Sequence, residues 1–286
     1  MADNRSPARW LLANTVRIEC ARRDRSVSTG TGFICRLLPK DGYSAPVLVT
    51  SRHVIVGAQR GRLHLPLVDA TGQPRAAQSQ TILLDDFQAR WLPHPEPAVD
   101  LCVMPAAELL VELQQRSKLA LQMVDASLIP TPIELGELTA GEEVVVVGYP
   151  NGIWDAVNNR PILRRAITAT EPNMDYMGRP EFLIDTAWLP GASGSPVFLW
   201  NRGGHATPAG NLRGRTRMHL LGVLCTSPVG RMTGAGDLSS GRPEQPGTAF
   251  ATIPSNFGVV VQARKVLEFE PILEALAARG QQRWPW

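Results

Sequence analysis

The sequence predicts an all-β protein made of two antiparallel β-barrels, followed by a C-terminal helix. Short runs rich in valine, leucine and isoleucine recur along the chain, and turn residues separate them. The chain contains 25 glycines and 24 prolines, a high share that suits the many turns of a barrel protein. One helical segment divides the apolar runs into two clusters, which predicts one barrel on each side of it.

The predicted strands form one cluster in each half of the chain. In the first half they are 15–20, 31–38, 45–54, 62–68, 80–84 and 99–105. In the second half they are 141–150, 161–170, 181–189, 195–200, 218–227 and 248–254. A stretch rich in glycine, serine and proline, 229–247, separates the last two strands and is expected to be a surface loop.

The spacing of apolar residues predicts two helices. One face of the segment 106–124 carries Leu109, Leu110, Leu113 and Leu119. A closing helix over 259–279 carries Val266, Leu267, Ile272, Leu273 and Leu276 on one face. The predicted organisation is an N-terminal segment 1–14, a first barrel 15–105, a helical connector 106–125, a second barrel 126–256, and a C-terminal helix and tail 257–286.

The composition indicates a folded protein, which we expect to be cytoplasmic. The 286-residue chain is 44% hydrophobic and 19% charged, as is typical of a globular protein with a substantial core. Its net charge of +3 gives no reason to expect nucleic acid as a partner, and the short cluster Arg213, Arg215 and Arg217 is interpreted as a solvated loop. No run approaches the roughly 20 apolar residues of a membrane span, and the N-terminus lacks a signal-peptide pattern, so no membrane partner is expected.

The four cysteines are Cys20, Cys35, Cys102 and Cys225. None forms a Cys-x-x-Cys pair, and no histidine lies at zinc-ligand spacing, so neither a metal nor another cofactor is expected. Each cysteine lies in an apolar, strand-like run, which favours free buried thiols in a reducing compartment. A disulfide between Cys20 and Cys35 across a hairpin is the alternative left open.

Three short segments carry the residues of hydrolytic chemistry. His53 ends an apolar run in LVTSRHVIV, Asp100 begins one in PAVDLCVMP, and Ser193 lies in the glycine-rich bend LPGASGSPVF. A serine hydroxyl attacks a peptide carbonyl only when a histidine takes its proton, and a carboxylate holds that histidine in the required tautomer. Glycines at 191 and 194 permit a sharp turn, so the N–H groups of Gly191 and Ser193 are the expected oxyanion donors.

The order and context of these residues resemble those of chymotrypsin-like serine peptidases. The order histidine, aspartate, serine differs from that of subtilisins and α/β-hydrolases. The segment DTAWLPGASGSP resembles the Asp-Ala-Ala-x-x-Pro-Gly-x-Ser-Gly-Gly-Pro run of bacterial trypsin-like peptidases and HtrA-type protease domains. The segment VVVVGYPNG resembles their Gly-Tyr-Pro segment, and TAFATIPSN is similar to their last barrel strand. The resemblance covers roughly residues 15–265. It implies two six-stranded barrels, a His53–Asp100–Ser193 triad and serine endopeptidase activity on proteins or peptides.

The sequence departs from the digestive members of this family at two positions. Ala192 stands where trypsins have the acidic residue that pairs with a newly cut N-terminus, so activation of that kind is not expected. Val54 follows His53 where the secreted enzymes have a disulfide-forming cysteine, which agrees with a reducing compartment. Control is therefore expected to act through loop ordering or through a regulatory protein partner.

The same resemblance assigns residues to substrate binding. Ala187 and Leu224 fall where other members read a charged side chain before the scissile bond, and the small and apolar residues present here favour a small or aliphatic one. Thr226 and Ser227 are expected to offer backbone groups to an extended substrate, as in strand addition. Cys225 falls behind the carboxylate of the triad.

Two other functions compete with this interpretation. A catalytically silent binding module would show a damaged triad or lack the glycine of the oxyanion turn, and neither is seen. An esterase of another fold would carry its nucleophile in Gly-x-Ser-x-Gly between a strand and a helix. Here Ser195 takes the last of those positions and a strand-like segment follows, so the esterase is not favoured. The resemblance to bacterial trypsin-like peptidases implies a regulated peptidase in cytosolic processing or defence.

Overall fold

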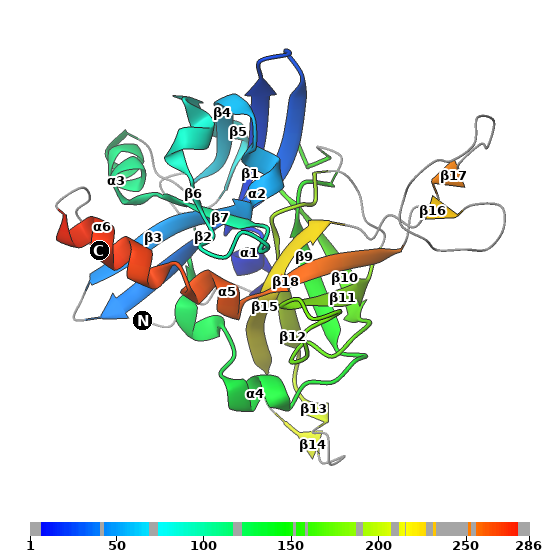
Figure 1. Cartoon of the computed structure of the whole chain (residues 1–286). Helices are drawn as coiled ribbons and strands as arrows, with labels where there is room; N and C mark the ends of the chain where they lie inside the picture. The colour runs from blue at the N-terminus through cyan, green and yellow to red at the C-terminus, as the bar shows by residue number, and fades with distance from the viewer. Residues whose placement is uncertain are drawn as a thin grey trace.

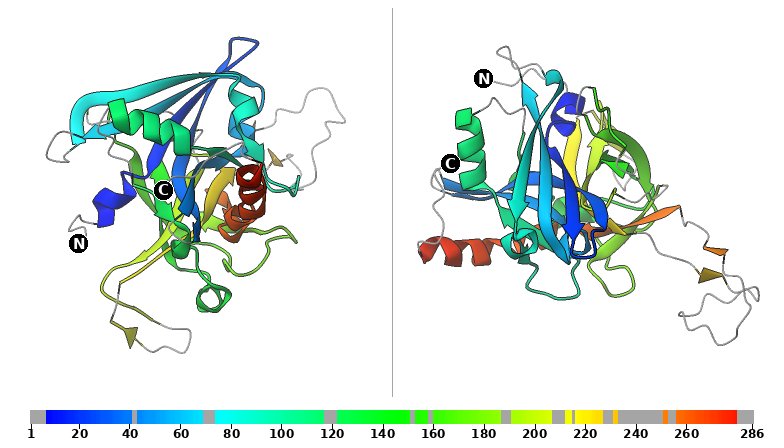
Figure 2. Two further views of the ribbon diagram at one scale, coloured as in Figure 1. Left: turned by 90° about the vertical axis from the view of Figure 1, so that its left-hand side faces the viewer. Right: turned by 90° about the horizontal axis from the view of Figure 1, so that it is seen from above.

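Two β-structures lie side by side in the computed structural model of the chain (Figure 1, Figure 2). The residues described are 7–40, 43–68, 74–116, 122–150, 153–157, 160–186, 191–206, 212–214, 216–226, 231–232, 251–252 and 256–279. The first β-structure comes mainly from the N-terminal half and the second from the C-terminal half. Short helices connect and cover them.

The N-terminal half forms an open sheet, not the closed six-stranded barrel that the sequence predicted. Its strands follow the order β5-β4-β1-β2-β3-β7-β6, and β8 pairs in parallel with β2. They are β1 (Thr15–Arg22), β2 (Val27–Lys40), β3 (Tyr43–Ser51), β4 (Ala58–Val68), β5 (Pro74–Asp85), β6 (Leu92–Pro93), β7 (Leu101–Pro105) and β8 (Val124–Asp125). The edge strand β6 has two residues and ends in a proline, which has no N–H to donate, so among the described residues nothing pairs β6 with β5.

The C-terminal half forms a closed antiparallel barrel, in agreement with the sequence prediction. Its six strands follow the order β10-β11-β18-β15-β12-β9. They are β9 (Glu143–Gly148), β10 (Ile162–Thr168), β11 (Glu181–Asp185), β12 (Ser195–Asn201), β15 (Arg217–Thr226) and β18 (Phe257–Gln262).

The last strand, β18, corrects the sequence interpretation, which gave 257–262 to the C-terminal helix. The run Val259–Val261 consists of β-branched residues, which favour a strand, and it pairs with both β11 and β15. The strand predicted at 248–254 lies largely outside the described residues. Its described part, β17 (Ala251–Thr252), pairs with β16 (Arg231–Met232) and not with the barrel.

The helices are short. They are α1 (Pro7–Leu11), α2 (Arg52–Ile55), α3 (Ala107–Arg116), α4 (Pro132–Gly136), α5 (Arg264–Leu267) and α6 (Glu270–Ala278), with 3-10 turns η1 (Phe87–Arg90) and η2 (Ala126–Leu128). A small hairpin of β13 (His205–Ala206) and β14 (Leu212–Arg213) projects from the barrel (Figure 1). Of the helix predicted over 106–124, residues Ala107–Arg116 form α3; residues 117–121 lie outside the described residues, and strand β8 begins at Val124.

A hydrophobic core joins the two halves of the molecule. Its members include Phe33, Val47 and Leu101 of the sheet, Phe198 and Val223 of the barrel, and Phe269 and Leu273 beside the last helices. Trp10 of α1 packs edge-on against Phe198 of the barrel, with the ring centroids 5.8 Å apart. The Leu38 N–H of β2 donates to Glu270 of α6 at 2.9 Å. Apolar burial contributes about 25 cal/mol per Å², so this shared core holds sheet and barrel together.

All four cysteines are buried and free, as the sequence predicted. Cys20 lies opposite Ser28 on the neighbouring strand, and Cys35 lies opposite Val47. Cys20 and Cys35 therefore do not face each other across the hairpin, and the disulfide between them is excluded.

The cluster of three arginines is not a simple solvated loop. Arg217 is buried in β15, where its guanidinium donates to Asn201 at 3.0 Å and pairs with Glu142 at 3.2 Å. The side chains of Arg213 and Arg215 lie outside the described residues.

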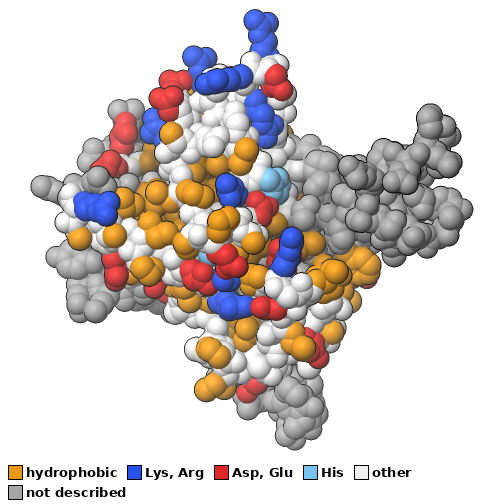
Figure 3. All heavy atoms as spheres, viewed as in Figure 1, with side chains coloured by type: hydrophobic (Ala, Val, Ile, Leu, Met, Phe, Trp, Pro, Cys, Tyr) orange, Lys and Arg blue, Asp and Glu red, His pale blue; other side chains and the backbone are white. Residues whose placement is uncertain are grey.

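None of the helices within the described ranges is long and apolar enough to cross a membrane. On the face seen in Figure 3, acidic and basic side chains lie among hydrophobic ones.

Replacing Arg217 with methionine is expected to destabilise the protein by about 3 kcal/mol, because Glu142 would be left as an unpaired and largely buried charge. Unfolding in guanidinium chloride measures the loss. The double variant Glu142→Gln/Arg217→Met removes both charges and should recover part of it. A loss below about 0.5 kcal/mol in the single variant would mean that this pair contributes no more than a surface pair.

Candidate active site

The pairing of β3 with β7 brings His53 and Asp100 together. In this antiparallel pair Ser51 lies opposite Leu101. His53 follows the end of β3 by two residues and Asp100 immediately precedes β7, so the register places both at the same end of the sheet.

Asp100 accepts two hydrogen bonds from His53. The Nδ1 atom of the ring lies 2.6 Å from Oδ2, and the His53 backbone N–H donates to Oδ1 at 2.9 Å. The Arg52 N–H donates to the Asp100 carbonyl at 3.2 Å. Asp100 thus satisfies the first N–H groups of α2, which the side chain of its N-cap residue Ser51 does not. The carboxylate holds the hydrogen of the ring on Nδ1 and leaves Nε2 of His53 as an acceptor.

Ser193 lies in a tight turn that two glycines make possible. Gly191 has a φ of 85° and Gly194 a φ of 87°, conformations that other residues rarely adopt. A Cβ atom on Gly194 would overlap the carbonyl oxygen of Thr31, so only glycine fits there. The turn leads directly into β12, and neither the Gly191 nor the Ser193 N–H has an acceptor among the described residues.

The end of β15 lies between Ser193 and the histidine–aspartate pair. The Ser193 hydroxyl donates to the Cys225 carbonyl at 2.6 Å. The Cys225 sulfur lies 3.5 Å from the Asp100 carbonyl oxygen and 3.2 Å from the Ser51 hydroxyl. Burial raises the pKa of the Cys225 thiol well above its ordinary value, and Asp100 raises it further, so the thiol stays neutral beside the carboxylate. The structure thus places the Ser193 hydroxyl against Cys225, and among the described residues no hydrogen bond joins it to His53.

The family model of the trypsin-like peptidase domain matches residues 30–205. The chain belongs to the trypsin-like peptidase family. Two solved structures similar to this chain are an HtrA-type protease AlgW with a tripeptide and a serine endoprotease from Yersinia pestis. Both matches are 14% identical and cover 96% of this chain, with TM-scores of 0.48 and 0.46. The chain spans 65% of the first protein and 68% of the second. No curated protein sequence matches it.

Two of the four residues assigned to substrate binding can be placed in the peptidase. Leu224 is completely buried in the barrel core, so its side chain presents no surface to a substrate in this conformation. The Thr226 backbone pairs with Val259 at the end of β15. Ala187, Ser227 and the side chain of Thr226 lie outside the described residues.

Sequence patterns do not single out Glu181, yet it lies in the electrostatic field of the site. Glu181 is the half-buried first residue of β11. Burial raises the pKa of its carboxyl; Arg179 partly offsets this and Asp100 adds to it. A glutamate at the start of a strand looks like any surface residue, so no signal in the sequence marks it.

Thr31 was also missed, although its N–H donates to the Ser193 carbonyl at 2.9 Å. A signal exists in this case, because Thr31 stands between Gly30 and Gly32 within β2. Glycine inside a strand often marks the close approach of another backbone.

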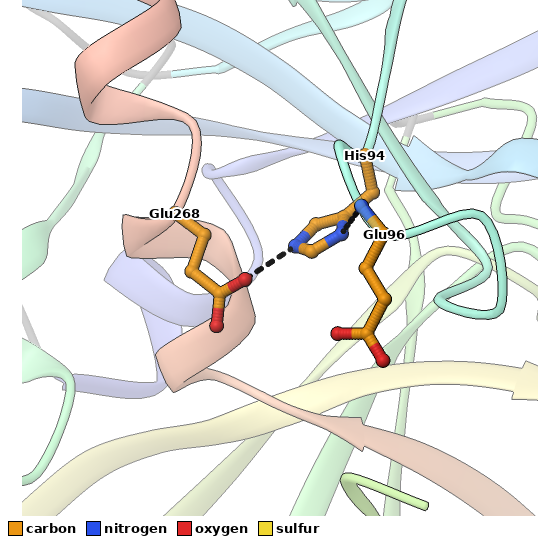
Figure 4. A group of neighbouring side chains, drawn as sticks. All are labelled: His94, Glu96 and Glu268. Carbon is orange, nitrogen blue, oxygen red and sulfur yellow. Dashed lines mark hydrogen bonds and ion pairs between the residues drawn. The ribbon is translucent and has the colours of Figure 1, made fainter.

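A second cluster, His94, Glu96 and Glu268, has the residue types of a metal site (Figure 4). The ammonium of Lys265 already lies 2.7 Å from Glu96 and 2.9 Å from Glu268, and its hydrogen bond lowers the pKa of Glu96. The Nδ1 atom of His94 accepts the Glu96 N–H at 3.1 Å, and Nε2 lies 3.1 Å from the Lys265 carbonyl. Both ring nitrogens and both carboxylates are therefore engaged, which fits a structural junction between α5 and the loop before Asp100 better than a metal site.

Replacing Glu181 with glutamine is expected to stabilise the protein only at pH values above the raised pKa of its carboxyl. Because the folded-state pKa of Glu181 is raised, its protonated form favours folding, and that contribution is lost as the pH rises through this pKa. The Tm of Glu181→Gln should exceed that of the wild type by at most about 2 °C near pH 8, since solvent screens a half-exposed carboxylate, and the difference should vanish near pH 4. Calorimetry at both pH values measures it. An equal gain at both would assign the effect to packing and not to charge.

Proposed function

We propose that this chain is a serine endopeptidase in which Ser193 is the nucleophile, His53 the general base and Asp100 the residue that orients the base. The observation that carries the proposal is the 2.6 Å hydrogen bond between His53 Nδ1 and Asp100 Oδ2. A carboxylate in this place stabilises the imidazolium that forms when Nε2 takes a proton. The glycine turn that presents Ser193 supports the same assignment.

In the proposed mechanism the Ser193 hydroxyl first rotates from Cys225 to the Nε2 atom of His53. Its Oγ then forms a bond to the substrate carbonyl carbon while Nε2 takes the hydroxyl proton. The oxyanion accepts hydrogen bonds from the N–H groups of Gly191 and Ser193. His53 returns the proton to the leaving amine as the C–N bond breaks. Water, activated by the same ring, then hydrolyses the acyl-enzyme ester.

We propose that the substrates are proteins or peptides bound in extended form. The backbone at Thr226 and Ser227 would pair with the substrate, and a small or aliphatic side chain would enter the pocket beside Ala187 and Leu224. Because Leu224 is buried, that pocket would open on binding. Four free thiols suit a reducing, cytoplasmic compartment, and processing or defence under the control of a regulatory protein is the proposed role.

The first test is labelling by a fluorophosphonate probe, which reacts only with an activated serine. The wild type should be labelled and Ser193→Ala should not. Ser195→Ala is the matched control, since Ser195 is a buried serine two residues away, and it should still be labelled. Absence of labelling in the wild type would favour the catalytically silent binding module.

Replacing Asp100 with asparagine is expected to lower kcat by about 10⁴-fold, because an amide that donates to Nδ1 holds the ring in the wrong tautomer. Initial rates on a cleaved peptide measure the effect. Asp85→Asn, which alters an exposed aspartate of β5, is the control and should keep the wild-type rate. A loss below about tenfold in Asp100→Asn would be incompatible with the orienting role.

A further inference from the structure

Thr31 of β2 is completely buried, and each of its polar groups has a partner. Its N–H donates to the Ser193 carbonyl at 2.9 Å, and its hydroxyl donates to the Gly191 carbonyl at 3.0 Å. The hydroxyl accepts from the Tyr149 N–H at 3.0 Å, and the Thr31 carbonyl accepts from the Thr50 hydroxyl at 2.6 Å. One residue of the sheet thus holds two carbonyls of the serine turn, which belongs to the barrel.

These bonds fix the peptide units on both sides of the Ser193 N–H. Thr31 holds the carbonyls of Gly191 and Ser193. The carbonyl between them, that of Ala192, accepts from the Ser195 N–H at 3.1 Å. In a trans peptide the C=O and N–H point in opposite directions. The Ser193 N–H shares its peptide unit with the Ala192 carbonyl, so it is turned to the opposite side, free to meet an oxyanion.

Thr31 and the turn are in close contact. A Cβ atom on Gly194 would overlap the Thr31 carbonyl oxygen, and one on Gly148 would lie 2.7 Å from the Thr31 hydroxyl oxygen. Ala192 offers no carboxylate for an ion pair, so the orientation of the turn depends on neutral hydrogen bonds.

We propose that Thr31 is a positioning residue that holds the Ser193 N–H in its oxyanion-binding orientation from the opposite side of the interface. The inference rests on the proposed peptidase function, in which this N–H stabilises the oxyanion. The hydroxyl is the deciding group, because it connects the Gly191 carbonyl to the Tyr149 N–H. Thr31→Val keeps the shape of the side chain and removes this connection.

The test compares Thr31→Val and Thr31→Ser with the matched control Thr168→Val. Thr168 is also buried in the barrel, and its hydroxyl makes the same kinds of bond: it donates to the Thr139 carbonyl at 3.1 Å and accepts from the Glu142 N–H at 2.9 Å. For each protein the rate of fluorophosphonate labelling, the hydrogen exchange of amides 193–195 and the Tm are measured. The Tm shows the loss of stability that both valine variants share.

Thr31→Val should slow labelling by about 10- to 100-fold, less than the loss of an oxyanion donor itself, and should speed exchange in the turn. Thr168→Val should have a Tm similar to that of Thr31→Val, but its labelling rate and its exchange in the turn should match those of the wild type. Thr31→Ser should keep most of the wild-type labelling rate. Equal slowing in both valine variants, or wild-type labelling and exchange in Thr31→Val, would overturn the proposal.

Two further outcomes can be distinguished from failure of the Thr31 proposal. Should Thr31→Val fail to fold, Thr31→Cys in reducing buffer carries the same expectations with smaller changes, because a thiol is a weak donor. Absence of labelling in the wild type would count against the proposed peptidase function alone. Comparing the hydrogen exchange of amides 193–195 in Thr31→Val and in the wild type would then still show whether Thr31 holds the turn.

Discussion

Hydrogen bonds across the interface between the open sheet and the barrel set the geometry of the candidate site, because its groups come from both sides. His53 and Asp100 belong to the sheet, and Ser193 belongs to a turn of the barrel. Thr31 bonds the Ser193 carbonyl, and the Cys225 sulfur lies against the Asp100 carbonyl. Each such bond contributes only about 1 kcal/mol to stability. Their effect on rate is larger, since misplacing reacting groups by about 1 Å can cost on the order of 100-fold.

The Ser193 hydroxyl donates to the Cys225 carbonyl at the end of β15. In the proposed mechanism this hydroxyl turns to His53 before it attacks the substrate. Breaking one such bond costs about 1 kcal/mol net when another acceptor replaces it. That cost is small beside the roughly 8–23 kcal/mol by which enzymes commonly lower a barrier.

The barrel could be predicted from the sequence because most of its strands are short runs rich in apolar residues between turns. The open edge of the first sheet could not, because closure depends on the length and register of edge strands such as β6, which apolar periodicity does not encode. Strand β18 was missed because its valines run directly into the apolar face of α5 and α6, so one helical pattern covered both.

In the candidate site, too, some residues could be predicted from the sequence and others could not. His53, Asp100 and Ser193 stand in motifs that local sequence makes visible. The role of Thr31 rests on a contact with Gly191, 160 residues away in the chain. The glycines on either side of Thr31 indicate that another backbone approaches closely, but no local pattern identifies that partner. The sequence does not show the proximity of Glu181 to Asp100 either, because the two come close only when the barrel packs on the sheet.

The way the serine turn is held limits how this chain could be controlled. With Ala192 before the nucleophile, a new N-terminus would find no carboxylate to pair with, and the turn is already held by Thr31. In the proposed mechanism, two features of this conformation would change when substrate is bound and cleaved: the bond from Ser193 to the Cys225 carbonyl, and the burial of Leu224. Both lie at the end of β15. A ligand or partner that bound along this strand end would act on the nucleophile and on the pocket together, whereas one that bound elsewhere would have to act through the core that joins sheet and barrel.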